Sequence, residues 1–378
     1  MIKTAISFMR YERSKSIGIL VSIVISIFLV GQQVGIFLFL ASIIGGLVNN
    51  SDTEKADIFV ISNRTENMNQ LTPFDIRWVN QLKGIEDVAD AQGFLMMTVP
   101  IKFPDGSVSA TTLVGSDFPE MIAGPRNGLI KEGNYGNLLG QNVVSVDRYD
   151  FKTFGHKMHT GYAFEINGKR AEVGVITQNA KGYSSPIAYT TTENVRNLAN
   201  VSPYLVSGVI ITAKNKQDIP AIIDRINSSQ IDLRAWSRKD LVRSTVIKIT
   251  TANNMGVSMG IMVIFAVISG FFIIGLTLYS STFDRIKDYG TLKAIGATNG
   301  YIKKLIMTQT AIYGVLGFIL SYLLLIVAQI GMAKAGLVIR YTPLFLLALF
   351  SLTMIIAIGG SLFSVKKLSK VDPSMVFK

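Results

Sequence analysis

Four long apolar segments are spread unevenly along the chain. The first runs from Ile17 to Val48 without a charged residue, and the other three crowd the C-terminal third, at about 255–280, 305–333 and 343–365. Each exceeds the roughly twenty residues that a helix needs to cross a bilayer core. A cleaved signal peptide would have a shorter apolar region and a small-residue cleavage site. The pattern therefore predicts four membrane-spanning helices, the first long enough to tilt or to project beyond the membrane.

Between the first and second of these segments, apolar and polar positions alternate in short runs bounded by turn residues, which predicts strands. The clearest runs are IFVIS at Ile58, VVSV at Val143 and LVSGVIIT at Leu205. In YAFEINGKRAEVGVIT, Asn167 and Gly168 supply the positive φ angles of a tight hairpin turn.

A helix is expected from Asp218 to Ile226, with Asp218 as its cap and an apolar stripe that includes Ile219, Ile222 and Ile223. Residues 49–250 are thus predicted to form a mixed α+β domain. The chain has no cysteine, so this domain must be stable through its own core.

Basic residues gather in three segments: before the first span, between the second and third, and after the fourth. They are Lys3, Arg10, Arg13, Lys15, Arg285, Lys287, Lys293, Lys303, Lys304, Lys366, Lys367, Lys370 and Lys378. The positive-inside rule puts these segments in the cytoplasm, and it accounts for the net charge of +12 without a nucleic-acid partner. Four spans then place the α+β domain on the outer side and both termini in the cytoplasm.

The first fifteen residues carry Ile2, Ala5, Ile6 and Met9 at helical spacing, away from the charged positions. Residues 1–16 are predicted to form an amphipathic helix in the cytoplasmic interface. The alternative is a frayed, charged terminus.

The composition and the motifs limit the functions that the chain can have. With 49% hydrophobic and 16% charged residues and a mean hydropathy of +0.39, lipid must be part of the solvent. No phosphate loop, nucleophile elbow or HExxH motif occurs, so the chain itself is not expected to be an enzyme, nor to hold a metal or cofactor. His156 and His159 form an HxxH pair, which we interpret as surface histidines because a clear third ligand is missing.

The predicted spans contain amides but no charged or histidine side chain. The amides include Gln32, Gln33, Gln309 and Gln329. Ion-coupled transporters carry ionisable relays at membrane depth, so the energy for any transport would have to come from another chain. The amides either join helices by hydrogen bonds or face a partner or the interface.

The most informative stretch is STFDRIKDYGTLKAIGATNGYIKKLIMTQT, residues 281–310. An apolar position recurs there every third residue and predicts a short amphipathic helix: Ile286, Tyr289, Leu292 and Ile295. Gly296 is suited to end that helix. Such a helix fits a groove on a soluble partner, and the alternative is a charged connector between two spans.

Within this stretch, DYGTLKAIGATNGYIKKL resembles the loop of ABC transporter permeases in the FtsX, MacB and LolC/LolE superfamily. It is most similar to DevC-type permeases, whose loop carries a similar GTLKAIG segment. The closing VKKLSKVDPSMVF, with Asp372 and Pro373, resembles the family's basic C-terminal segment. VVSVDRYDFKTFG and EINGKRAEVGVI are more weakly similar, and residues 65–140 match only in general character.

The resemblance implies a helical membrane protein of the type VII ABC permease architecture, with a large α+β domain in the periplasm of a bacterial inner membrane. It implies a homodimer that pairs with two copies of a separate cytoplasmic ATPase, which binds ATP and Mg²⁺. Mechanotransmission would drive efflux of a lipid, glycolipid, peptide or drug-like cargo, with a periplasmic adaptor (membrane fusion protein) and an outer-membrane channel as further partners.

The resemblance also assigns the coupling role to residues 284–297. The residues expected at this site are Asp284, Arg285, Asp288, Tyr289, Gly290, Leu292, Lys293, Ile295 and Gly296. Direct contacts with the ATPase are expected from Tyr289, Leu292, Lys293 and Ile295.

The expected order of segments follows. It is 1–16 interfacial helix, 17–48 first span with an outward stalk, 49–250 periplasmic domain, 251–280 second span, 281–304 coupling loop, 305–333 third span, 334–342 external loop, 343–365 fourth span and 366–378 basic tail.

Three other functions are compatible with this layout. Within the family, the chain could be an FtsX-like regulator of a cell-wall hydrolase, although those have smaller outer domains, or a lipoprotein-releasing permease. From another class, a membrane-anchored ligand receptor would need a cytoplasmic output domain. The predicted cytoplasmic segments are too short to form one.

Overall fold

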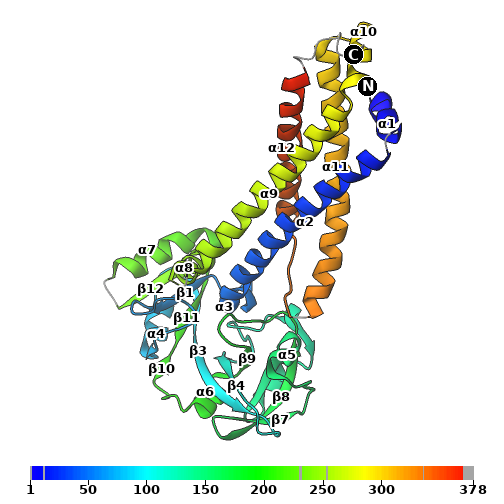
Figure 1. Ribbon diagram of the computed structural model, residues 1–378. Helices are drawn as coiled ribbons and strands as arrows, with labels where there is room; N and C mark the ends of the chain where they lie inside the picture. The colour runs from blue at the N-terminus through cyan, green and yellow to red at the C-terminus, as the bar shows by residue number, and fades with distance from the viewer. Residues whose placement is uncertain (1, 12, 230–231, 253, 335, 369–378) are drawn as a thin grey trace. The chain divides into compact units, whose positions relative to one another are not determined.

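A computed structural model describes the chain except residues 1, 12, 230–231, 253, 335 and 369–378 (Figure 1). The predicted C-terminal motif, Asp372 and Pro373, lies outside the described residues. The chain forms two compact units. Residues 1–38, 257–333 and 339–378 make the helical unit, and residues 39–256 with 334–338 make the α+β unit.

In the described residues of the helical unit there are six helices. They are α1 Ile2–Tyr11, α2 Arg13–Ile44, α9 Met255–Asp284, α10 Ile286–Ala294, α11 Asn299–Lys334 and α12 Pro343–Leu368. Four of them, α2, α9, α11 and α12, are long and apolar enough to cross a membrane. The α+β domain lies between the first and second of these in sequence, which confirms the predicted fold class.

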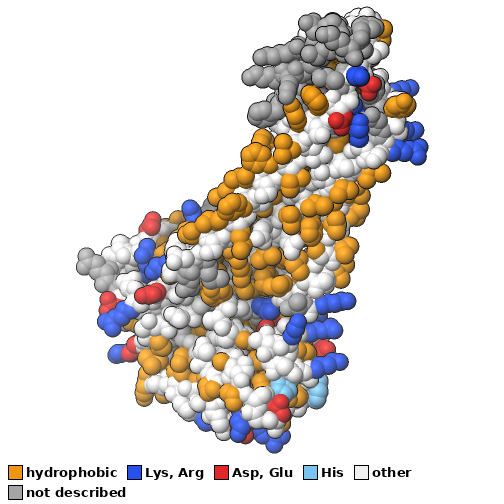
Figure 2. All heavy atoms as spheres, viewed as in Figure 1, with side chains coloured by type: hydrophobic (Ala, Val, Ile, Leu, Met, Phe, Trp, Pro, Cys, Tyr) orange, Lys and Arg blue, Asp and Glu red, His pale blue; other side chains and the backbone are white. Residues whose placement is uncertain are grey.

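Small residues let the long helices approach closely. A Cβ atom added to Gly317 of α11 would lie 2.4 Å from Ile23 of α2, and one added to Gly360 of α12 would lie 2.8 Å from the Cα of Gly275 in α9. The contact-forming face of the unit is apolar, with Ile23, Ile27 and Ile274 fully buried. Hydrophobic side chains such as Phe265 and Phe272 are also exposed, and on the side drawn in Figure 2 hydrophobic side chains lie along the long helices. An all-round apolar helix surface is expected where lipid is the solvent.

The α+β unit contains twelve strands and six helices within its described residues. The strands are β1 Ile58–Ser62, β2 Phe74–Asp75, β3 Val88–Lys102, β4 Val108–Gly115, β5 Ile130–Glu132, β6 Val143–Asp147, β7 Ala163–Ile166, β8 Lys169–Thr177, β9 Ile187–Thr190, β10 Leu205–Val206, β11 Gly208–Ala213 and β12 Leu233–Ser237. The helices are α3 Gly46–Asn50, α4 Arg77–Lys83, α5 Phe151–Phe154, α6 Thr192–Ala199, α7 Ile219–Ser228 and α8 Arg238–Ala252. The predicted strands at Ile58, Val143 and Leu205 are all present.

The long strand β3 links two parts of one sheet. Its first half, up to Phe94, pairs with β11 in the order β12-β1-β11-β3. Its second half, from Leu95, pairs with β4 and then with β7, which leads to β8, β6 and β5. A single strand therefore carries the hydrogen-bond ladder from one part to the other.

Both faces of the first part are buried. In β1, Ile58 and Val60 point to a core that includes Ile222 and Ile226 of α7. The alternate residue Phe59 points to a second core, which also contains residues of α3 and α8. This period-two division follows from the pleat of a strand that is covered on both sides.

The hairpin prediction is confirmed. Asn167 and Gly168 have φ angles of 50° and 75°, and Ile166 pairs with Lys169 across the two-residue turn. The predicted cap of α7 is wrong in its chemistry. Asp218 stands at the N-cap position, but its backbone is already helical and its side chain makes no cap bond. It accepts a hydrogen bond from Asn215 Nδ2 instead, at 3.1 Å.

Candidate functional site

The loop between α9 and α11 contains the short helix α10, and its end is closely defined. The N–H of Ala297 donates to Leu292 O at 2.9 Å, and the N–H of Gly296 donates to Lys293 O at 3.0 Å. Gly296 has a φ of 101°. This pair of bonds around a left-handed glycine is a Schellman motif, accompanied by partial burial of Leu292 and Ala297 in one apolar cluster. The prediction that Gly296 ends the helix is confirmed.

One face of α10 is buried inside the helical unit. Tyr289 is 2% exposed and packs with Ala5 of α1 and with Ile302, Leu305 and Ile306 of α11. Burial raises the pKa of the Tyr289 phenol to about 12. Tyr289 therefore holds α10 against α1 and α11 and is not on the surface of the described chain. Its predicted contact with a partner is not available in this arrangement.

The other face of α10 is exposed. Ile295, directly after the helix, is 78% exposed, and Asp284 and Asp288 also lie on the surface. Leu292 and Lys293 are half-buried, whereas Arg285 and Gly290 are buried. The four residues expected to contact a partner are thus separated by the structure, and Ile295 is the most accessible of them.

The N-terminal helix is connected to the same region. Ala5 lies in the cluster around Tyr289, and Ser16 joins α1 to α11 because its Oγ donates to Met9 O at 2.8 Å and lies 2.7 Å from the Tyr313 hydroxyl. The sequence predicted that residues 1–16 form an amphipathic helix but did not indicate this packing. Its position in a membrane interface stays a prediction.

A second candidate site lies in the α+β unit, where α3 meets α8. The guanidinium of Arg238 donates to Ser51 Oγ and to the carbonyls of Val48, Asp52 and Ala56, at 2.7 to 3.0 Å. Burial lowers its pKa from the ordinary value. A cation bonded to the last carbonyls of α3 completes that helix end. In sequence, α3 follows the first span and α8 precedes the second, so Arg238 joins the two entry points of the domain.

Lys181 makes a similar junction with the loop between α11 and α12. Its Nζ lies 3.3 Å from Asp150 Oδ1 and donates to Gly336 O at 3.1 Å, while its carbonyl accepts from Asn50 of α3 at 3.2 Å. Burial raises the pKa of Asp150 to about 7, although the Lys181 charge opposes the shift. Neither Arg238 nor Lys181 was identified from the sequence, since their partners are distant along the chain.

The histidines lie near the surface of the same unit. The His156 ring is tilted by 35° against the Phe103 ring, at a centroid distance of 4.3 Å, and its Nε2 lies 3.0 Å from Ser107 Oγ. His159 is exposed beside Thr160. In the described part of the chain no group of three metal-ligating side chains is present. Of the amides, Gln329 donates to Ile339 O at 2.7 Å and so ties the end of α11 to the segment before α12.

A family model for the FtsX-like permease C-terminal region matches residues 260–373. Two curated relatives are uncharacterized ABC transporter permeases from two strains of Mycobacterium tuberculosis, each 23% identical over 222 residues. The aligned stretch covers 58% of this chain and 58% of each relative, so the chain spans little more than half of the relatives' length.

Solved structures with similarity to the chain include two extracytoplasmic domains. The extracellular domain of the noncanonic ABC-type transporter YknZ from Gram-positive bacteria is 14% identical with a TM-score of 0.35, over 48% of this chain and 100% of that one. The periplasmic region of MacB from Actinobacillus actinomycetemcomitans is 13% identical with a TM-score of 0.37, over 55% and 96%. The residues matched by the FtsX-like family model include α10, and the narrower likeness to DevC-type permeases stays a prediction.

Proposed function

We propose that this chain is the permease subunit of an ATP-driven ABC transporter of the FtsX and MacB type. It couples ATP hydrolysis by a separate ATPase to movements of the α+β domain on the other side of the membrane. The FtsX-like match across residues 260–373 and the description of the relatives as ABC transporter permeases support this function. The structural observation that carries it is the exposed Ile295 at the end of the anchored helix α10.

The geometry suggests how force would be transmitted. A groove on the ATPase takes Ile295, with Leu292 and Lys293 at the edge of the contact. Tyr289 has a positioning role, because its buried ring fixes α10 to α11 and α1. A single residue, Arg285, separates the end of α9 from the start of α10, so a displacement of α10 also moves α9. A short connection between two helices transmits movement better than a long flexible one.

The proposal extends to the assembly. Two copies of the chain bind two ATPase subunits, which hold ATP and Mg²⁺, and the domain outside the inner membrane contacts a periplasmic adaptor and an outer-membrane channel. The cargo is a lipid, glycolipid, peptide or drug-like molecule. Regulation of a cell-wall hydrolase is the rival outcome, and it would give a hydrolase in place of the adaptor when the chain is isolated with its partners.

The decisive test is Ile295→Asp, with ATPase co-purification as the measurement. A buried charge in the contact should reduce ATPase recovery at least about tenfold. Val108→Asp is the matched control, because Val108 is 70% exposed and lies in the α+β unit. Tyr289→Phe should keep the ATPase, since the ring is retained. Unchanged recovery with Ile295→Asp would refute the proposed contact.

The membrane topology can be tested independently because the chain has no cysteine. A single Ile295→Cys should react with a membrane-impermeant thiol reagent only after the cytoplasmic side is opened. A single Val108→Cys should react from outside in intact spheroplasts. Labelling of both residues from the same side would exclude the proposed topology.

A further inference from the structure

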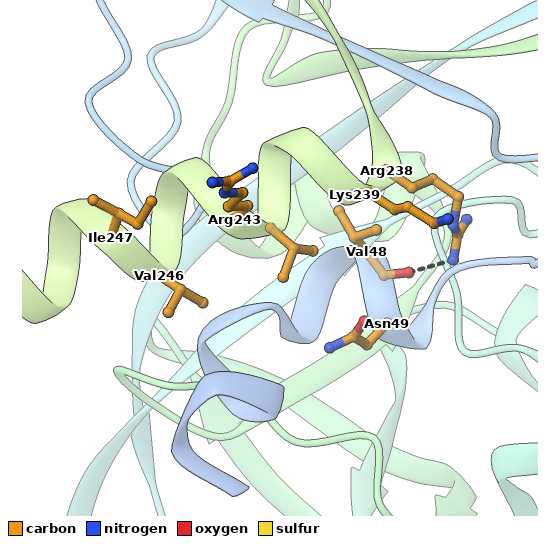
Figure 3. Close-up of a pocket in the computed structure, with 8 residues that line it drawn as sticks. Val48, Asn49, Arg238, Lys239, Arg243, Val246 and Ile247 are labelled. Atoms are coloured by element: carbon orange, nitrogen blue, oxygen red, sulfur yellow. Dashed lines mark hydrogen bonds between the residues drawn. The ribbon is translucent and has the colours of Figure 1, made fainter. Parts of the chain in front are cut away.

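An open groove of about 550 Å³ lies between α3 and α8 in the α+β unit (Figure 3). It is lined by Val48, Asn49, Arg238, Lys239, Val242, Arg243, Val246 and Ile247. The opposite side of α8, with Leu241, Thr245 and Ile249, is buried against the domain. The groove is therefore lined by the side of α8 that points away from the core of the domain.

The lining changes character along α8. Figure 3 shows Arg238 and Lys239 at the N-terminal end of α8, Arg243 along its middle, and Val246 and Ile247 at the other end. Ile247 is 50% exposed. Eight residues lie between Ile247 and Gly256, the first residue of the second span, so the aliphatic end is the one nearer the membrane along the chain.

The cations that line the groove differ in the hydrogen bonds and ion pairs that they already make. Arg238 already donates to four acceptors around the end of α3. Lys239 and Arg243 are exposed and one helical turn apart, and neither makes an ion pair with any residue that the structure describes. No acidic residue lines the groove. A ligand there would be anionic at one end and apolar at the other.

We propose that this groove binds an anionic phospholipid from the leaflet that faces the α+β unit. Its phosphate lies at Lys239 and Arg243, and its acyl chain follows the aliphatic end of α8 toward the bilayer. The order of charges and aliphatic groups matches the headgroup-outward orientation of a lipid in that leaflet. A second copy of the chain fits less well, because a symmetric interface through this face would bring like charges together without an acidic partner.

The test uses the full-length protein with a single Asn49→Cys, labelled in the groove with an environment-sensitive dye and placed in phosphatidylcholine nanodiscs. Increasing phosphatidylglycerol should produce a saturable change in emission. In the Lys239→Gln, Arg243→Gln double variant the half-saturating fraction should rise at least about fivefold, since the two charge-assisted contacts to the phosphate inside the groove are lost. Lys248→Gln, the same change on α8 outside the groove, should leave the titration unchanged.

Several outcomes would overturn the proposal. The double variant could titrate like the wild type, phosphatidylcholine alone could give the full signal, or the double variant could lose its dimer in mass measurements, which would make the groove an interface between copies. The aliphatic end is tested by Val246→Ser with Ile247→Ser, which should also weaken the response. If that variant responds normally, or if soluble glycerol phosphate displaces the signal completely, the site binds an anion alone and the lipid assignment is wrong.

Discussion

Phenylalanine side chains have opposite surroundings in the two units of this chain. In the α+β unit, Phe59 and Phe94 are no more than 1% exposed, whereas Phe265 and Phe272 of α9 are 65% and 57% exposed. The first pair is removed from water by other side chains, and the second pair would be removed from water by lipid. The hydrophobic residues of this sequence therefore serve two purposes: in the α+β unit they form a protein core, and in the helical unit many of them face lipid.

The two units also differ in how much their packing depends on polar groups. In the α+β unit the buried carboxylate of Asp147 accepts from the N–H groups of Tyr149 and Ala180 and from Thr177 Oγ1, at 2.7 to 3.0 Å. In the helical unit, α2 and α11 share a buried hydroxyl pair, Ser16 with Tyr313 at 2.7 Å, and otherwise meet through close approach, as at Gly317 and Ile23. Cores in water are specified by satisfied polar networks as well as packing, while helices in lipid rely mainly on packing of small residues.

The largest effect is expected from Phe59→Ala, which removes a fully buried ring from the α+β core. The free energy of unfolding should fall by about 3 to 5 kcal/mol, and the melting temperature should fall by roughly 10 °C. Trp78 and Trp236 are the two tryptophans of the chain and both lie in this unit, so tryptophan fluorescence of the full-length protein in detergent reports its melting. Phe265→Ala should leave that transition in place. Equal shifts in melting temperature for both variants would show that the two rings contribute equally to the α+β core, contrary to their burial.

A pH effect of intermediate size is expected at Asp150. Its pKa is raised from 3.8 to about 7 in the folded protein, so the unfolded chain releases this proton first. Its contribution to stability is therefore greatest below about pH 4 and is lost as the pH rises toward 7, by up to about 1.4 kcal/mol per pH unit. The melting temperature of the wild type should fall relative to Asp150→Asn across this window. Parallel curves for the two proteins would contradict the assignment.

The two units also contain glycines that differ in the space around them. A Cβ on Gly46 would lie 2.4 Å from the carbonyl oxygen of Lys181, whereas one on Gly18 of α2 would meet no atom within 4 Å. Gly46→Ala should therefore cost about 1 to 3 kcal/mol in unfolding free energy. Gly18→Ala should be neutral or slightly stabilising, because alanine favours a helix by about 1 kcal/mol. Tryptophan melting checks Gly46→Ala, and far-UV circular dichroism checks Gly18→Ala.

The smallest effect is expected at the surface ion pair of the helical unit. Lys15 Nζ lies 3.9 Å from Asp284 Oδ2, and both side chains are more than a third exposed. Asp284→Asn should change the unfolding free energy by less than about 1 kcal/mol, because water and salt screen exposed pairs. Circular dichroism melts at low and high salt provide the measurement. A large loss confined to low salt would show that this pair contributes more than its exposure indicates.

The parts of the fold that depend on local pattern were predictable from the sequence. Hydropathy located the four long helices, a short apolar run located β1 at Ile58, and Asn167 with Gly168 located the hairpin. Strand β3 was not predicted, because it changes partners at Leu95 and its two halves are buried by different cores. Alternation along one strand is lost when both of its faces are covered in turn.

The candidate site was predictable only in part. The position of α10 and its end at Gly296 follow from spacing and glycine chemistry, which are local. The burial of Tyr289 depends on Ala5 and on α11, and no periodicity within residues 284–297 distinguishes it from Ile295. The roles of Arg238 and Lys181 likewise depend on carbonyls far away in sequence. A pattern of three-residue spacing can identify a stripe but not which protein surface covers it.

Strand order also governs how this protein can be made. Strand β1 is the first strand of the α+β unit to be synthesised, yet both of its neighbours, β11 and β12, begin only at Gly208 and Leu233. At ordinary rates of translation, β1 waits on the order of ten seconds for a partner. Its completed sheet then immediately precedes α8 and the second span. An apolar strand therefore stays without its sheet partners until the chain has nearly reached its second span.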